Sequence, residues 1–257
     1  MKYIDNYIDF NEKAWNNFAQ ANYQWTIPVS SETIELAKKG IWDVVATPTK
    51  PVLKSWFPKD LNNIKVLCLA GGGGQQGPIF AALGADVTVF DNCRKQLEKD
   101  EFVAQRDGLK IKTIKGDMKD LSSLSDETYD LIMQFAGAYV DNVLPVWQEA
   151  YRVLKKGGTM IAGHNNPNEF IFDLESMEKG EFIVRHKIPY SDLTSISKEE
   201  FERVTSNEGV CFGHSLDDLI QGQIDAGFLI AGFYEDRGGS PLDEYIPTFF
   251  ATKAIKL

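Results

Sequence analysis

The chain of 257 residues is 43% hydrophobic and 25% charged, so it is long enough to fold as one large domain or two small ones around a full core. Its 27 basic and 37 acidic residues give a net charge of −10, which disfavours binding to the phosphates of a nucleic acid. The cysteines, Cys68, Cys93 and Cys211, form no CxxC pair, which argues against a metal site or a disulfide framework and favours a reducing cytoplasm.

Residues 1–60 are predicted to form an accessory helical segment. Aromatic residues recur at helical spacing between Tyr3 and Phe18, and Ser30 precedes a short helix that Gly40 ends. The first residues lack the continuous apolar core of a signal peptide, and no run in the chain reaches the roughly 18 apolar residues that span a membrane. We therefore expect no membrane association.

Strand-like and helix-like segments alternate strictly between residues 61 and 163. The expected strands are Lys65–Leu69, Asp86–Phe90, Lys112–Lys115, Tyr129–Phe135 and Thr159–Gly163. The expected helices cover 75–83, 93–107, 119–124 and 140–154. Near-continuous apolar strands that alternate with helices predict an α/β fold, with a mostly parallel sheet covered by helices on both faces.

The alternation stops after the fifth strand. We interpret residues 164–213 as an insertion over the open end of the sheet, in which 181–188 resembles a strand. A helix is expected over 215–226, with an apolar face made of Leu216, Leu219, Ile220 and Ile224. The last two strands are expected at Phe228–Tyr234 and Thr248–Ile255, so that residues 61–257 make one domain.

The stretch VLCLAGGGGQQGPIFAALGADVTVFD, from Val66 to Asp91, reads as a strand, a glycine turn, a helix and a strand that ends on an acid. Gly72, Gly74 and Gly77 satisfy the spacing GxGxxG, and glycines remove side chains where the backbone approaches a ligand. The acid is placed to accept hydrogen bonds from both hydroxyls of a ribose. The stretch predicts a nucleoside-containing cofactor, and its pattern also fits a nicotinamide or flavin.

Three later features separate these cofactors. The third strand ends in Asp117-Met118, where an acid and an apolar side chain can bind an adenine amine and pack on its ring. The fourth strand ends in Gln134, at the edge of the sheet where a ligand is expected. The helix that ends in Leu154 runs into Gly157-Gly158, which we interpret as a helix C-cap and a sharp return into the fifth strand.

This order of motifs resembles the class I S-adenosylmethionine-dependent methyltransferases of the small-molecule type (methyltransferase type 11, or ubiquinone/menaquinone-biosynthesis-like). The glycine motif of that family matches residues 70–74, its second-strand acid matches Asp91, its third-strand pair matches Asp117-Met118, and its L-[KR]-x-G-G turn matches residues 154–158. The resemblance implies a Rossmann-like seven-stranded sheet whose last strand is antiparallel. It covers residues 61–165 well and 213–257 in outline.

The resemblance also implies S-adenosyl-L-methionine as the cofactor and a small-molecule acceptor for its methyl group. The expected cofactor-binding residues are Ala70, Gly71, Gly72, Gly74, Asp91, Asn92, Asp117, Met118 and Gln134. The family often has an acid near the methionine part of the cofactor, at the position that Cys68 occupies in this sequence.

Methyl transfer needs near-attack geometry and exclusion of water more than it needs a catalytic side chain. A general base is required only for an un-ionised hydroxyl or a carbon acid, and His164 at the end of the fifth strand is the candidate. A packing histidine is the alternative. Asn165, Asn166 and Tyr190 are candidate acceptor contacts, although turn chemistry also accounts for the two asparagines. We expect most aromatic residues of the accessory segment and the insertion to form a core, and one or two to line a pocket.

Two other functions fit parts of the sequence. An NAD(P)-dependent oxidoreductase would need a Tyr/Lys or His/Asp set, for which we find no convincing spacing. A non-catalytic protein that binds S-adenosylmethionine would agree with Cys68 and with the lack of a certain base. The sequence leaves open the acceptor, the methylated atom and the oligomeric state.

Overall fold

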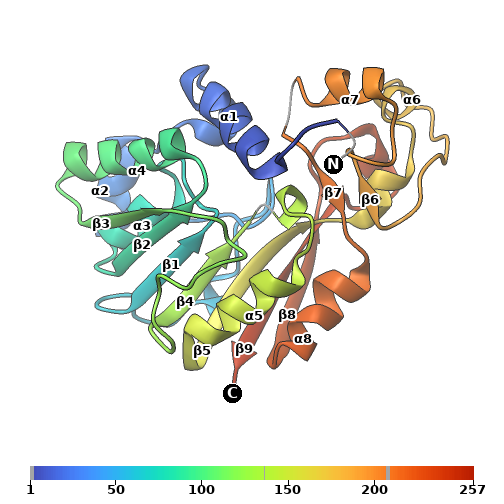
Figure 1. The fold of residues 1–257 in the computed structure, drawn as a ribbon. Helices are drawn as coiled ribbons and strands as arrows, with labels where there is room; N and C mark the ends of the chain where they lie inside the picture. Colours follow the sequence, from blue (N-terminus) through green and yellow to red (C-terminus); the bar gives the residue numbers. More distant parts are fainter. Residues whose placement is uncertain (1–2, 136, 207–208) are drawn as a thin grey trace.

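The computed structural model describes residues 3–135, 137–206 and 209–257, so parts of the predicted accessory segment, of the turn after the fourth strand and of the insertion lie outside the described residues. The described residues form a seven-stranded sheet with the order β3-β2-β1-β4-β5-β9-β8 (Figure 1). Its strands are β1 (Lys65–Leu69), β2 (Asp86–Asp91), β3 (Ile111–Lys115), β4 (Tyr129–Gln134), β5 (Leu154–Asn165), β8 (Phe228–Asp236) and β9 (Phe249–Lys256). β9 runs antiparallel to both of its neighbours, and the other pairs are parallel. The predicted fold class is therefore confirmed.

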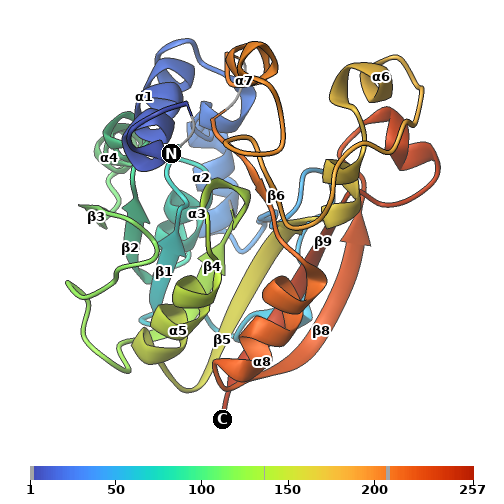
Figure 2. The same cartoon turned by 45° about the vertical axis from the view of Figure 1, so that its right-hand side comes forward.

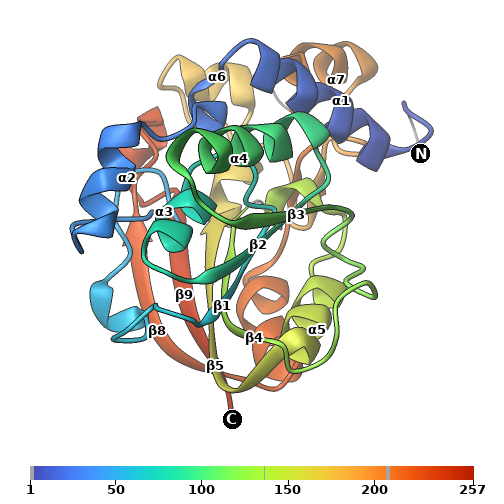
Figure 3. The same ribbon diagram turned by 90° about the vertical axis from the view of Figure 1, so that its left-hand side faces the viewer.

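Helices cover both faces of this sheet (Figure 3). The helices are α1 (Tyr7–Gln20), α2 (Ser31–Lys38), α3 (Gln76–Ala82), α4 (Arg94–Asp107), α5 (Leu144–Val153), α6 (Leu174–Glu178), α7 (Lys198–Val204) and α8 (Gly222–Asp225). Along β1, Leu67 packs in the same core as Trp147 of α5, whereas Cys68 packs on the opposite face with Phe80 of α3. Side chains alternate between faces along a strand, so a continuous apolar run fills both cores.

The chain before β1 forms the helices that the sequence predicts. Asn6 caps α1, and the Ser30 side chain accepts a hydrogen bond from the Thr33 N–H at the start of α2. Gly40, with φ of 82°, follows α2 in the left-handed conformation that ends a helix. No helix of the described ranges is long and apolar enough to cross a membrane.

A separate group of elements lies beyond the carboxyl ends of the strands, opposite the C-terminus (Figure 2). We call this group the cap, and it consists of α1, α6, α7 and the short strands β6 (Tyr190–Ser191) and β7 (Phe212–Gly213). Tyr7 of α1 packs with Phe201 and Phe212 in a third apolar core. The Asn11 amide also donates to Val210 O at 3.1 Å and accepts from Val210 N at 2.6 Å. The cap therefore joins the predicted accessory segment, residues 1–60, to the predicted insertion, residues 164–213.

Two expected helical features are wrong in the region after β3 and at the end of α5. Residues 119–124 form turns, because the Asp117 and Asp120 carboxylates accept hydrogen bonds from backbone N–H groups two residues ahead and compete with a helix. Gly157 and Gly158 do not cap α5, since Leu154 already has extended backbone. Gly157, with φ of 77°, lies instead where the register between β4 and β5 shifts.

The expected elements after residue 164 need two corrections. Residues 181–188 form no strand, because only an isolated bridge between Phe172 and Val184 is present and no neighbouring strand is available. The predicted helix over 215–226 begins with a π-helical turn, η5 (Asp217–Gln221), before α8. A π turn changes the 3.6-residue period, so Leu219 is buried while Leu216 is 52% exposed.

Gly163, near the end of β5, contacts the segment that precedes β1. A Cβ atom at this position would lie 1.5 Å from the Ala46 carbonyl oxygen. We expect Gly163→Ala to lower the free energy of unfolding by about 3 kcal/mol, because the backbone at residue 46 would have to move. Urea denaturation measures this loss. Gly137→Ala is the control, since the nearest atoms to its new Cβ would lie 3.8 Å away, and similar losses in the two variants would contradict the prediction.

Candidate active site

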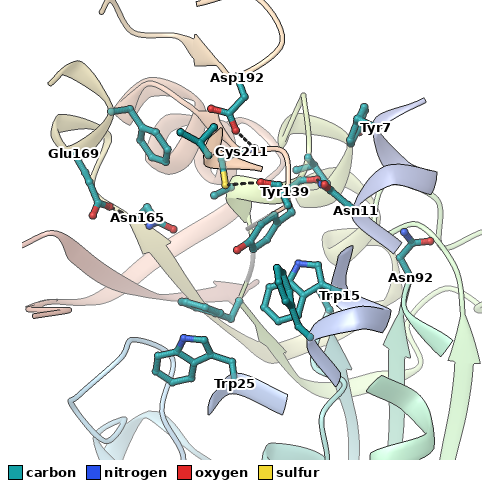
Figure 4. Close-up of a pocket in the computed structure, with 18 of the residues that line it drawn as sticks. Tyr7, Asn11, Trp15, Trp25, Asn92, Tyr139, Asn165, Glu169, Asp192 and Cys211 are labelled. Atoms are coloured by element: carbon teal, nitrogen blue, oxygen red, sulfur yellow. Dashed lines mark hydrogen bonds between the residues drawn. The ribbon is translucent and has the colours of Figure 1, made fainter. Parts of the chain in front are cut away.

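A cavity of about 550 Å³ lies between the carboxyl ends of the strands and the cap (Figure 4). Its walls come from the turn after β1, the ends of β2, β3 and β5, helix α1 and the insertion. Ligands of open α/β sheets bind at this edge. The cavity therefore identifies the candidate site without reference to any motif.

The glycine turn presents bare backbone to this cavity. Ala70, Gly71 and Gly72 line it, and Ala70 has a φ of 51°, which is uncommon for a residue with a side chain. A Cβ atom on Gly71 would lie 2.9 Å from the Cβ of Cys68, so the turn requires glycine there. Cys68 is fully buried beneath the turn and does not line the cavity. Gly74, expected to bind the cofactor, is also absent from the cavity wall.

Asp91 connects the end of β2 to the glycine turn. Its Oδ2 accepts a hydrogen bond from Gly72 N at 2.9 Å, and its Oδ1 accepts one from Cys93 N at 2.8 Å. Burial raises the pKa of the Asp91 carboxyl, whereas these two N–H groups lower it. Each carboxylate oxygen has a further lone pair, so Asp91 lines the cavity with acceptor capacity to spare.

Asp100 on α4 is a second carboxylate under the same turn. Its Oδ2 accepts hydrogen bonds from Gly73 N at 3.0 Å and from Gly74 N at 3.1 Å. The side chain is fully buried, and its Oδ1 has no hydrogen-bond partner among the described residues. Burial raises the pKa of Asp100 to about 8. Asp100 thus fixes the part of the turn that does not line the cavity.

The end of β3 supplies the next part of the wall. Asp117 and Met118 both line the cavity, and the Asp117 carboxylate accepts a hydrogen bond from Lys119 N at 3.0 Å. Asn92 lines it as well, and its side-chain amide donates to Ile8 O of α1 at 3.0 Å. The expected acid–apolar pair therefore lines the same cavity as the glycine turn.

Gln134, expected to bind the cofactor from the end of β4, does not line the cavity. The side chain is 1% exposed, and neither of its polar atoms has a hydrogen-bond partner among the described residues. Side chains alternate between the two faces of the sheet along β4. This alternation directs the Gln134 side chain toward the core that includes Leu69 and Val143.

His164 does not face the cavity, so the predicted position of its ring is wrong. The ring is 2% exposed, stacks on Phe250 with centroids 4.7 Å apart, and contacts Trp147 edge to face. Its Nε2 lies 3.3 Å from Thr252 Oγ1, and burial lowers its pKa to about 3. The reason is strand alternation, which directs His164 to the α5 face and the next residue, Asn165, to the cavity.

The three expected acceptor contacts have different positions. Asn165 lines the cavity, and its amide donates to Glu169 Oε2 at 3.2 Å. Tyr190 also lines it, and its hydroxyl donates to Asp192 Oδ1 at 2.7 Å. Asn166 does not, because both ends of its side chain bond to backbone groups of the surrounding loop. Turn chemistry therefore accounts for Asn166.

Several lining residues were not expected from the sequence. Aromatic side chains line the cavity more extensively than predicted, and they include Tyr7, Trp15, Trp25, Phe170 and Phe172. Glu169 and Asp192 belong to the irregular insertion, where no periodicity marks them. Gln96 of α4 is 5% exposed and lines the cavity beside the turn, and its Oε1 has no partner in the described part of the chain. The only indication of Gln96 in the sequence is a polar residue at a helix position that is buried in the structure.

The described residues contain no group of three or more His, Cys, Asp or Glu side chains that is arranged to hold a metal ion. The wall instead combines bare backbone, a strand-end carboxylate, an acid–apolar pair and an unpaired amide. These groups match the polar and apolar parts of an adenosine with an amino-acid side chain.

Comparison with known proteins decides which family this site belongs to. A model of the methyltransferase domain matches residues 67–162. The chain is also 52% identical to the methyltransferase YbaJ of Bacillus subtilis (strain 168) over 252 residues, which cover 97% of this chain and 98% of that protein. The chain belongs to the class I S-adenosylmethionine-dependent methyltransferases. Its cofactor is S-adenosyl-L-methionine, and the oxidoreductase alternative is wrong.

Solved structures of such methyltransferases share the fold. One from Mesorhizobium loti has a TM-score of 0.61 at 15% identity and covers 79% of this chain and 95% of its own. Another from Methanosarcina mazei has a TM-score of 0.56 at 18% identity and covers 82% of this chain and 99% of its own. At these identities the likeness concerns the methyltransferase fold alone.

The raised pKa of Asp100 predicts how the stability of this methyltransferase depends on pH. The unfolded chain releases the proton near pH 4, whereas the folded chain holds it to about pH 8, so the free energy of unfolding falls as pH rises between these values. Asp100→Asn keeps an oxygen for the two glycine N–H groups and removes the titration. Relative to this variant, we expect the wild-type protein to lose about 3 kcal/mol between pH 5 and pH 8 in urea denaturation. Parallel pH curves would contradict the prediction.

Proposed function

We propose that this enzyme transfers a methyl group from S-adenosylmethionine to a small molecule bound in the same cavity. The observation that carries the proposal is the continuity of one cavity from the glycine turn to the aromatic wall of the cap. A cavity of about 550 Å³ that the cap covers suits a small ligand better than a folded macromolecule. The net charge of −10 also disfavours a nucleic-acid acceptor, and three buried free cysteines fit a reducing cytoplasm.

Each cofactor contact in the proposal follows from a position in the cavity wall. Asp91 would accept hydrogen bonds from the ribose, and Asp117 with Met118 would hold the adenine. The backbone of residues 70–72 would pass beneath the methionine part. Asn92 and Gln96 would add polar contacts at the ribose end. Gly74 and Gln134 make no contact in this arrangement, because neither residue lines the cavity.

Rate enhancement in the proposed reaction comes from positioning. S-adenosylmethionine supplies a methyl group that its sulfonium already activates. The cap excludes water, and the cavity walls hold the acceptor in line with that methyl group. His164 is not the base in this proposal, because its ring lies in the core with its pKa lowered to about 3.

Asp91 provides the first test of the cofactor contacts. We expect Asp91→Ala to weaken S-adenosylhomocysteine binding by about 1.5–3 kcal/mol, because it removes charge-assisted hydrogen bonds. Isothermal titration calorimetry measures the affinity, and circular dichroism checks that the variant folds. Asp86→Ala, at the opposite end of the same strand, is the control and should bind like the wild type. Unchanged affinity of the Asp91→Ala variant for S-adenosylhomocysteine would contradict the proposed contact between Asp91 and the ribose.

A metabolite screen tests the acceptor class. We expect a fraction of small metabolites, incubated with enzyme and S-adenosylmethionine, to release S-adenosylhomocysteine and a methylated product detected by mass spectrometry. S-adenosylhomocysteine at about 100 times its dissociation constant should also stabilise the fold by about 2.7 kcal/mol, while NADH should not. Release only with a macromolecular fraction would contradict a small-molecule acceptor.

A further inference from the structure

Helix α1 forms a wall of the cavity at the carboxyl ends of β2 and β3. Residues from one face of the helix line the cavity, and they include Tyr7, Ile8, Asn11, Glu12 and Trp15. The Asn92 amide, directly after β2, donates to Ile8 O at 3.0 Å, and Lys115 at the end of β3 pairs with Glu12 at 2.6 Å. The proposed ribose acid and adenine acid lie within two residues of these contacts in the chain. An adenosine bound to both acids would therefore lie against α1.

A lysine joins the start of α1 to two further segments at this edge of the sheet. Lys119 Nζ donates to the Tyr7 hydroxyl and to Asp141 Oδ1, each at 2.7 Å. The Tyr7 hydroxyl in turn donates to the same Asp141 oxygen at 2.8 Å. Lys119 follows β3, Tyr7 is the first residue of α1, and Asp141 lies in the segment between β4 and α5. We call these three residues the Lys119 cluster.

Burial and charge make the Lys119 cluster a strong contact for α1. Tyr7 is 3% exposed, and burial raises its pKa to about 12, so the hydroxyl keeps the proton that it donates to Asp141. Burial lowers the pKa of Lys119, but hydrogen bonds to Asp141 and Tyr7 outweigh this effect and raise it, so the ammonium stays charged. A hydrogen bond from a charged, partly buried donor stabilises more than a solvent-exposed ion pair.

Lys119 itself lies outside the cavity wall, whereas Tyr7 is part of it. The Lys119 ammonium is 4.0 Å from Asp117 Oδ2, which exceeds the length of a hydrogen bond. Tyr7 also packs with Phe201 and Phe212 in the third apolar core. Lys119 therefore connects the strand ends to α1 and, through Tyr7, to the rest of the cap.

We propose that Lys119 is a positioning residue for the cofactor: it holds α1 against the strand ends, and α1 then retains bound S-adenosylmethionine. This inference rests on the proposed cofactor contacts of Asp91 and Asp117. The cofactor enters and leaves when α1 moves away from these two acids. Loss of the Lys119 ammonium speeds the release, because the closed position of α1 loses two hydrogen bonds while the residues that line the cavity stay the same.

Rates of ligand release measure this effect. Trp15 and Trp25 line the cavity, so stopped-flow tryptophan fluorescence with S-adenosylhomocysteine gives the association and dissociation rate constants. We expect Lys119→Met to raise the dissociation rate constant about tenfold. Lys155→Met is the matched control and should release like the wild type. Lys155 also binds a carboxylate, that of Asp130 at 2.8 Å, but it lies at the start of β5 and outside the cavity wall.

A covalent tether separates an action through α1 from a direct effect on Asp117. Cys93 Sγ lies 3.2 Å from Oδ1 of Asn16, which belongs to α1. In the double variant Lys119→Met/Asn16→Cys, oxidation by diamide should join the introduced thiol to Cys93 and hold α1 in place. We expect the oxidised protein, loaded with S-adenosylhomocysteine beforehand, to release it as slowly as the wild type. After reduction the same protein should release it as fast as Lys119→Met.

Three results would overturn the role of Lys119. The first is an unchanged dissociation rate constant in Lys119→Met. The second is fast release from the oxidised double variant when mass spectrometry shows the disulfide. The third is failure of the disulfide to form, because it contradicts the position of α1 beside Cys93. Circular dichroism shows whether Lys119→Met folds. If it does not, Tyr7→Phe, which removes only the hydroxyl of the cluster, takes its place in both measurements.

Failure of the proposed cofactor contacts gives a different result. If the wild-type protein does not bind S-adenosylhomocysteine, the cofactor contacts are contradicted, and limited proteolysis then tests Lys119 alone. Lys13 is an exposed residue of α1, and trypsin cleaves after it when the helix leaves the strand ends and unfolds. Lys119→Met should be cleaved there several-fold faster than the wild type. Equal cleavage rates overturn the inference without any ligand.

Discussion

The site depends on hydrogen bonds that the backbone N–H groups of one turn donate to two acidic side chains. Asp91 at the end of β2 binds the N–H of Gly72, and Asp100 of α4 binds those of Gly73 and Gly74. A turn with so many unpaired donors would otherwise be unstable away from water. Because Asp91 is fixed by the parallel sheet and Asp100 by helix α4, the bare backbone of the turn has a defined position at the cavity.

The part of the cavity wall at the ends of β1, β2 and β3 could be predicted from the sequence because its determinants are local. Residues that end neighbouring parallel strands meet at one edge of a sheet, so Asp91 and Asp117 were placed together without any knowledge of the fold's details. Gly71 and Gly72 followed from the same argument, since a strand-to-helix turn that touches a ligand needs positions without side chains. Gly74 and Gln134 were also expected to bind the cofactor, but neither residue lines the cavity. The spacing of residues in the sequence does not tell which side of a turn or strand a residue faces.

The part of the cavity wall that β5 and the insertion form could not be predicted to the same degree. His164 and Asn165 are neighbours, and a single step along β5 decides which of them reaches the cavity. Asp192 lies in a turn and Glu169 in a five-residue 3-10 helix, Pro167–Ile171, where the sequence has no periodicity that shows burial. The residues of the cap come together through contacts such as Asn11 with Val210, which are 199 positions apart in the chain. Composition suggested an aromatic core there, and the structure shows that many of these rings are also cavity wall.

The union of α1 with β7 has a consequence for the order of events during synthesis. The strands β1 to β5 pair with one another across shorter separations in the chain than the separation between α1 and its partner in the cap. Helix α1 is made before the sheet, yet its partner Val210 follows 199 positions after Asn11. Until Val210 has been made, a nascent chain therefore carries helix α1 without its partner and leaves the carboxyl ends of the strands uncovered, so that the cap closes over the cavity only after the sheet strands β1 to β5 have been synthesised.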